Sequence, residues 1–306
     1  MTLAILEFLA RLPMAWFHRA GKVFGWLVYV FSPPDARCLR DNLRAAGVFS
    51  NEQEYRALLR DAICQTGRGA AEWVKVWFGP QAEIDRLVIE CRGWSLVEEA
   101  RSRGKGIIFL VPHLGAFQVA MRYIARRLPL TALHRPPRQR WLKPLVMAGS
   151  KRSRLALAPT NLKGVEALIL ALRRGEAVAV PPDQAPNSRG GVWVDFFGRP
   201  AYTTTLPRKL QRATGAVILT AFAERLPRGK GFCLEIDTVP TGNLDETELN
   251  RVIERLVRRC PGQFLWSYNR YKIPRKARGM EQERRLKPLS TKLGDSPQPR
   301  SLTERR

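Results

Sequence analysis

The sequence predicts an α/β protein in which a mixed, mostly parallel sheet is flanked by helices. Two short apolar runs, residues 106–111 and 177–180, have the length and composition of strands that are buried on both faces. A segment with helical apolar periodicity follows the first run, and another, over about residues 162–174, precedes the second. This alternation is typical of parallel βαβ units with right-handed crossovers.

Two helices are expected before the first strand. Apolar residues spaced three and four apart predict them over residues 51–77 and 94–103. In the first of these segments, Gly67 and Gly69 interrupt the pattern. Gly104 ends the second segment, as is common for the residue that follows a helix.

Three more strands and a helix are expected after the second apolar run. Apolar runs at residues 192–197 and 216–222 predict two strands. Residues 231–237 alternate apolar and polar side chains, which predicts a half-buried strand nearer an edge of the sheet. Asp245, with Glu248 three residues later, is an N-cap signal for a last helix.

The composition indicates an anionic partner. The chain has 306 residues, is 45% hydrophobic and carries a formal net charge of +25. Such a charge suits nucleic acid, an anionic membrane surface, or an acidic carrier or substrate. The basic residues are spread along the chain without the signature of a nucleic-acid-binding module, so we expect no nucleic acid partner. Five scattered cysteines form no Cys-x-x-Cys pair, which argues against a zinc site or a disulfide framework.

The chain divides into three parts by composition. Residues 1–33 are mostly apolar and predict a membrane-associated helix, residues 34–274 form the main domain, and residues 275–306 predict a disordered basic tail. The longest uncharged piece near the start, residues 23–31, is too short to span a bilayer of about 30 Å. Three alternatives stay open for this segment. It could lie in the membrane interface, it could span the bilayer from residue 12 to residue 31 if Arg19 and Lys22 snorkel, or it could pack as a helix on the protein body.

His113 is the first candidate for a reacting group. It follows the strand at residues 106–111 through Pro112, and a helix begins directly after it. Asp183 follows the strand at residues 177–180 in the same way, so both side chains are expected at one edge of the sheet, where α/β proteins usually place reacting groups. The ordinary pKa of histidine suits a general base, and the alternative is a buried histidine with a structural role.

The hydrophobic start of the chain and five motifs that follow it in order resemble one known family. Pro112-His113-Leu114-Gly115 followed by a helix is similar to the His-x4-Asp/Glu motif of acyltransferases. The hydrophobic start of the chain and four later motifs resemble the late acyltransferases of lipid A biosynthesis, and the resemblance covers residues 5–274. These later motifs are Asn161-x2-Gly164, Pro182-Asp183-Gln184, Phe196-Phe197-Gly198 and residues 265–272.

The resemblance implies an α/β acyltransferase domain over residues 34–274 that needs no cofactor and no metal. It would move a fatty acyl chain from acyl-carrier protein to a hydroxyl of a lipid A precursor or related glycolipid, at the cytoplasmic face of a bacterial inner membrane. His113 would be the general base. The substrate-binding residues would be Arg135, Lys151, Arg152, Arg154, Asp183 and Gln184. The four basic ones would bind phosphates of the lipid or stabilise negative charge.

One residue departs from the family motif. Gln118 stands where the motif has Asp or Glu, and an amide can orient a histidine ring but cannot supply negative charge. Three explanations stay open: Gln118 orients His113 as a catalytic residue, an acid from elsewhere such as Asp183 supports it, or the chain is a catalytically impaired lipid-binding paralogue. An acyltransferase for another acceptor, such as a lysophospholipid, is a further alternative.

Overall fold

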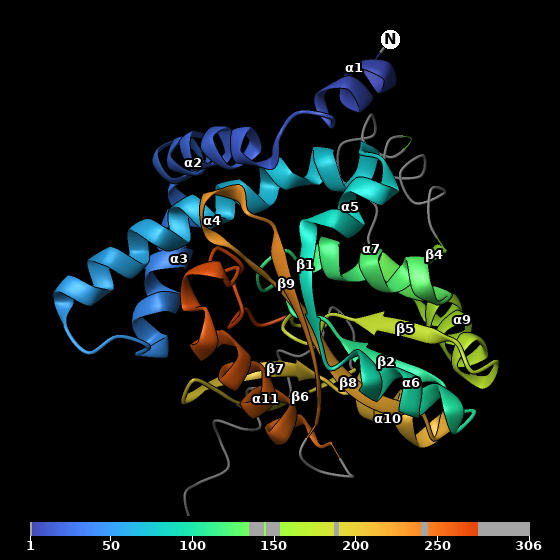
Figure 1. Cartoon of the computed structure of the whole chain (residues 1–306). Helices are drawn as coiled ribbons and strands as arrows, with labels where there is room; N and C mark the ends of the chain where they lie inside the picture. Colours follow the sequence, from blue (N-terminus) through green and yellow to red (C-terminus); the bar gives the residue numbers. More distant parts are fainter. Residues whose placement is uncertain (1, 135–143, 145–153, 187–189, 240–243, 275–306) are drawn as a thin grey trace, which may run out of the picture.

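The computed structural model describes residues 2–134, 144, 154–186, 190–239 and 244–274 (Figure 1). The expected tail at residues 275–306 lies outside the described residues. The described parts form a central sheet with helices on both faces, as the sequence predicts.

The central sheet has seven strands in the order β1-β9-β8-β2-β5-β3-β4 in the described part of the chain. Six strand pairs make it up, and all are parallel except β8 with β9. In sheet order the strands are β1 (Val88–Arg92), β9 (Phe232–Thr238), β8 (Val217–Arg225), β2 (Ile107–Leu110), β5 (Ala177–Val180), β3 (Leu130–His134) and β4 (Leu155–Pro159). Every residue of β2 and β5 is buried, which confirms the two central strands.

One expectation from the sequence needs correction. Strand β9 is not half-buried: its first five residues are buried, and Glu235 among them is paired with Arg92 and Arg259. The long helix expected over residues 51–77 is confirmed as α4 (Glu52–Phe78), which runs through Gly67 and Gly69 without a break. A Cβ atom on Gly67 would lie 2.0 Å from the carbonyl oxygen of Gly21 on a neighbouring helix, so this glycine permits close helix packing.

Two apolar layers cover the sheet. On one face, α6 (Trp94–Ser102), α7 (Phe117–Arg127) and the end of α4 pack against the sheet. On the other face, α9 (Leu162–Arg173), α10 (Leu206–Thr214) and α11 (Glu246–Arg259) do the same. Alternate residues of each central strand therefore enter different layers, as in Ile107 and Ile108.

Shorter elements complete the described chain. Helix α5 (Gln81–Leu87) leads into β1, and β6 (Gly191–Phe196) pairs with β7 (Arg199–Thr204) in a separate antiparallel hairpin. Two 3-10 turns follow, η1 (Pro227–Gly229) and η2 (Pro261–Gln263).

The segment expected as one helix over residues 1–33 holds two in its described part, α1 (Thr2–Leu9) and α2 (Met14–Phe31), and α3 (Pro33–Ala46) follows. Helix α2 lies along α4, with Met14, His18, Gly21 and Gly25 buried on one stripe (Figure 1). Its other side is exposed. Among the described helices, none combines the length and the apolar character that crossing a membrane requires.

Candidate active site

The turn between β2 and α7 carries His113, and the end of β5 leads to Asp183. Strands β2 and β5 are adjacent and parallel, with Leu110 beside Val180. His113 and Asp183 each come three residues later, so the register of the sheet brings them to the same level. The sequence prediction that they share one edge is therefore confirmed.

His113 and Asp183 form a hydrogen-bonded pair. The Nδ1 atom of His113 lies 3.0 Å from Oδ1 and 3.2 Å from Oδ2 of Asp183, and the backbone N–H of His113 donates to Oδ2 over 3.1 Å. Asp183 is buried, whereas 17% of the His113 side chain is exposed. Because the carboxylate engages Nδ1, it fixes the ring orientation and presents Nε2 to the exposed side.

The environment favours the charged form of both partners. Burial alone would lower the pKa of His113, but the charge of Asp183 and its hydrogen bond outweigh burial and raise this pKa above its ordinary value. Burial alone would raise the pKa of Asp183, but the charge and hydrogen bonds of His113 lower it. The carboxylate is therefore ionised at neutral pH and stabilises a proton on the imidazole.

Gln118 contacts a different partner. Its Oε1 accepts a hydrogen bond of 2.7 Å from the indole Nε1 of Trp77 on α4. The polar side-chain neighbours of the His113 ring in the described structure are Asp183 and Gln184, whose Nε2 lies 3.3 Å from Nε2 of His113. His113 is thus paired with the carboxylate of Asp183, the candidate that the second of the three explanations names, and not with position 118.

The turn between β2 and α7, residues 111–116, is named the catalytic turn after the candidate residue His113, and its conformation depends on Gly115. This residue has a φ of +59°, and a Cβ atom there would lie 2.1 Å from the carbonyl oxygen of Ala223. The backbone N–H of Ala116 donates to Ala223 on β8, and the N–H of Leu265 donates to the carbonyl of His113. The turn is therefore held from both sides by backbone contacts that its own sequence does not indicate.

A cavity of about 270 Å³ opens beside His113, between α4 and the catalytic turn. Ala70 and Val76 line it from α4, and Phe117 and Phe264 line it from the other side. Polar side chains are also on its wall, among them Gln118, Glu72 and Arg225. His113 therefore adjoins a space whose accessible surface is mostly apolar, which suits an apolar substrate group.

Of the four predicted basic contacts, the structure describes only Arg154. Arg135, Lys151 and Arg152 lie outside the described residues. Arg154 is exposed and directly precedes β4, so it lies at the amino edge of the parallel strands, opposite to the edge that carries His113. The structure thus separates Arg154 from His113. Among the described residues, no cluster of His, Cys, Asp and Glu could hold a metal ion.

Comparison with known proteins identifies the family. The family model described as bacterial lipid A biosynthesis acyltransferase matches residues 1–273. The lipid A biosynthesis lauroyltransferase of Escherichia coli is 27% identical over 280 residues, which cover 88% of this chain and 90% of that protein. The palmitoleoyltransferase of the same organism is 25% identical over 277 residues, 88% of this chain and 89% of that protein.

A third relative matches a shorter part. The lipid A biosynthesis acyltransferase of Haemophilus influenzae is 29% identical over 189 residues, which cover 57% of this chain and 56% of that protein. The family match, by contrast, spans nearly the whole described chain, including the edge of the sheet that carries His113 and Asp183. The chain therefore belongs to the bacterial lipid A biosynthesis acyltransferases.

Proposed function

We propose that this acyltransferase moves a fatty acyl chain from the thioester of acyl-carrier protein to a hydroxyl of a lipid A precursor, with His113 as general base and Asp183 as its carboxylate partner. The observation that supports this most directly is the His113–Asp183 pair, which leaves one ring nitrogen at the edge of a largely apolar cavity. Two relatives named as a lauroyltransferase and a palmitoleoyltransferase of lipid A biosynthesis support a fatty acyl group as the part that is moved and a lipid A precursor as the acceptor.

The chemistry follows from the roles of the two side chains. Nε2 of His113 takes the proton of the acceptor hydroxyl while the oxygen attacks the thioester carbonyl. Asp183 stabilises the imidazolium that forms. When the carbon–sulfur bond breaks, the imidazolium returns the proton to the thiolate of the carrier, so that an ester and a free thiol leave the site.

Gln184 is a substrate-binding residue in this proposal. Its amide nitrogen lies 3.3 Å from Nε2 of His113, which is the atom that must contact the acceptor hydroxyl. An entering hydroxyl takes this place, and the displaced amide N–H can then donate to the carbonyl oxygen on which negative charge develops. The apolar lining of the cavity, such as Ala70 and Val76, accommodates part of the acyl chain.

The outer faces of α1 and α2 suit a lipid surface. Large apolar side chains are exposed there: Ile5, Phe8, Trp16, Val23, Phe24, Leu27, Val30 and Phe31. Arg11, Arg19 and Lys22 are exposed beside them. An apolar stripe with aromatic and basic residues is typical of helices that lie in a membrane interface. We propose that these helices attach the enzyme to the cytoplasmic face of the inner membrane.

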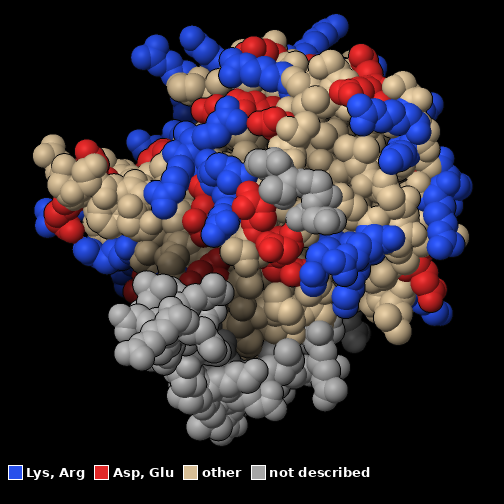
Figure 2. Space-filling model, turned by 90° about the horizontal axis from the view of Figure 1, so that it is seen from below, with Lys and Arg blue, Asp and Glu red and all other residues tan. Residues whose placement is uncertain are grey.

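The charge of the surface favours an acidic donor. Lys and Arg side chains are distributed widely over the face seen from below, with acidic side chains between them (Figure 2). The net charge of +25 attracts both anionic lipid and an acidic carrier protein over distances up to about a Debye length.

Mass spectrometry of lipid A and phospholipids, with and without the gene, tests the proposal. The expected result is a lipid A species that gains one ester-linked acyl chain only when the wild-type chain is expressed. The same product should form when the purified full chain is given acyl-carrier-protein thioester and the lipid A precursor. An acylated lysophospholipid as the product would replace the proposed acceptor, and the absence of any product would favour an impaired lipid-binding paralogue.

A further inference from the structure

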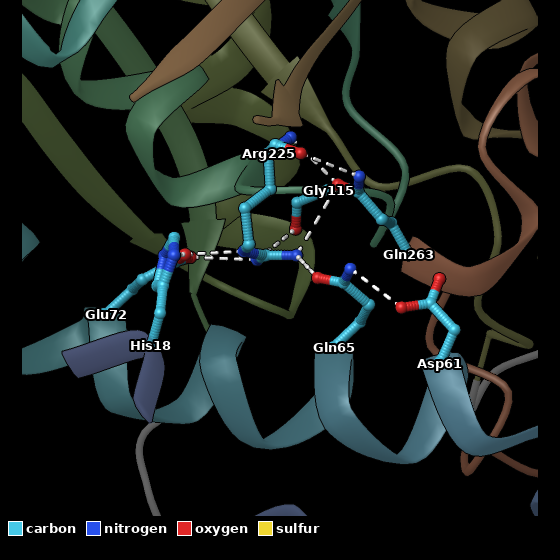
Figure 3. Close-up of polar contacts among 7 residues, drawn as sticks. All are labelled: His18, Asp61, Gln65, Glu72, Gly115, Arg225 and Gln263. Carbon is cyan, nitrogen blue, oxygen red and sulfur yellow. Dashed lines mark hydrogen bonds and ion pairs between the residues drawn. The ribbon is translucent and has the colours of Figure 1, made fainter. Parts of the chain in front are cut away.

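Arg225, the last residue of β8, lies buried next to the catalytic turn although the proposed chemistry does not use it. All five N–H bonds of its guanidinium have acceptors (Figure 3). Nε and Nη2 donate to the two carboxylate oxygens of Glu72, and Nη1 donates to Gln65 and, over a longer distance, to Gln263. The remaining N–H, also on Nη2, donates over 3.2 Å to the carbonyl oxygen of Gly115.

The contact with Gly115 connects Arg225 to the reacting histidine. Gly115 comes two residues after His113, and its positive φ gives its carbonyl the direction that meets the guanidinium. The backbone of Arg225 is fixed in turn by Gln263, whose side-chain amide accepts from its N–H over 2.8 Å and donates to its carbonyl over 3.0 Å. The guanidinium is therefore a rigid support for the turn that carries His113.

Glu72 and His18 extend this network to the amino-terminal helices. Glu72 lies on α4, and its Oε1 is 2.6 Å from Nε2 of His18 on α2 (Figure 3). Burial alone would raise the pKa of Glu72, but the charge and hydrogen bonds of Arg225, together with His18, lower it, so the carboxylate is ionised. His18 belongs to the buried stripe of α2, the helix whose other side exposes apolar residues.

We propose that Arg225 is a positioning residue: it fixes the catalytic turn through the carbonyl of Gly115, and Glu72 and His18 tie this support to α2. A lysine cannot replace it, because one ammonium group cannot bond in the plane to a carboxylate and a carbonyl at once. Stability alone does not account for the buried ion pair, because a protein with apolar residues of similar volume in its place is often equally stable. The proposal rests on the proposed role of His113.

The first test compares two double variants. Glu72→Gln/Arg225→Met removes both buried charges and the donor to Gly115. The matched control is Lys75→Met/Glu83→Gln, which removes another pair on α4 and α5, where the buried Lys75 donates to the carbonyls of Ala10 and Leu12. Both double variants leave no unpaired buried charge, so both are expected to fold. Thermal unfolding of each checks this.

Turnover and histidine spectra distinguish positioning from stability. The Glu72→Gln/Arg225→Met variant is expected to lose kcat by on the order of 10²-fold, as a misplaced catalytic group does, with little change in KM. The control should keep its kcat. The chain has three histidines, so the ring 15N signals of His113 can be followed directly, and they should shift in the first variant only. Equal kcat and unchanged His113 signals in a folded Glu72→Gln/Arg225→Met protein would overturn the proposal.

His18 tests the connection to α2. His18→Leu is expected to shift the His113 signals and to lower kcat less than the double variant does, because Glu72 still holds the guanidinium. His18→Gln, which can still donate to Glu72, should restore both. Unchanged His113 signals in His18→Leu would remove α2 from the proposal. The spectra do not depend on acyl transfer, so a wild-type chain without activity would refute the proposed function and still leave the positioning of His113 measurable.

Discussion

Two side-chain pairs contact the catalytic turn, His113 with Asp183 and Arg225 with Glu72, and they differ in what they leave for a substrate. In His113–Asp183, the histidine side chain is 17% exposed, and the carboxylate engages only one of its two ring nitrogens. In Arg225–Glu72, the two side chains are 2% and 4% exposed and every N–H of the arginine has an acceptor, although both residues line the same cavity as His113. The open pair, His113–Asp183, can exchange a proton with a substrate, whereas the closed pair, Arg225–Glu72, has no donor left for one and holds its neighbours in place.

Removing the histidine of the open pair, His113, should have the largest effect on the rate. His113→Ala is expected to lower acyl transfer by about 10⁴-fold, the upper end of what a general base supplies, because no other ring nitrogen stands at the cavity in the described structure. The rate of product formation from acyl-carrier-protein thioester measures this. Thermal unfolding should be measured alongside, because removal of the ring leaves the buried Asp183 carboxylate without its partner and should lower stability, so the rate is compared at a temperature where both proteins are folded. A variant with the wild-type rate would show that His113 is not the base.

Asp183→Asn should have the next largest effect. The amide keeps the shape but loses the charge, and the loss in kcat is expected to be on the order of 10²- to 10³-fold, somewhat below the 10⁴-fold seen for the equivalent change in serine proteases. Single-turnover rates of acyl transfer would measure it. A loss of less than about tenfold would show that the carboxylate is not needed.

Asp183→Asn should also change the pH dependence of kcat in a defined direction. The base must be unprotonated, and Asp183 raises the pKa of His113, so the acidic limb of wild-type kcat should lie above about pH 6.5. Without the carboxylate charge, burial remains and lowers the pKa, so the limb should move to lower pH in Asp183→Asn. A pH profile of kcat for both proteins checks this, and a limb that moves upward would contradict the stated cause.

The parts of the structure that could be predicted from the sequence are those with local patterns. The apolar runs identified β2 and β5, and their parallel order placed His113 and Asp183 at one edge. Strand β3 at residues 130–134 was missed, because its polar Thr131 and His134 break the apolar run. The sequence predicts the helix that contains Gly67 but gives no reason for the glycine, because its packing partner, Gly21, lies 46 positions earlier.

Nothing in the local sequence indicates that Arg225 supports the catalytic turn. Arg225 and Gly115 are 110 positions apart, and Glu72 and His18 are 54 positions apart. An arginine at the end of a strand is normally solvated, so its sequence position indicates nothing about a buried role. The closed pair therefore emerged only from the three-dimensional structure, whereas the open pair followed from strand order and a family motif.

Gln118→Glu is expected to have the smallest effect on the rate. It tests most sharply whether Asp183 is the carboxylate partner of His113. A carboxylate at position 118 can still accept the hydrogen bond from Trp77, so the variant should fold. Because Asp183 already bonds Nδ1 of His113, the new acid has no free site on the ring, and kcat should change by less than about tenfold, which corresponds to 1.4 kcal/mol. Asp183→Asn/Gln118→Glu should then be as slow as Asp183→Asn alone. Recovery of the rate in that double variant would show that a carboxylate at position 118 can take the place of Asp183, so that the two acids are interchangeable supports for one histidine.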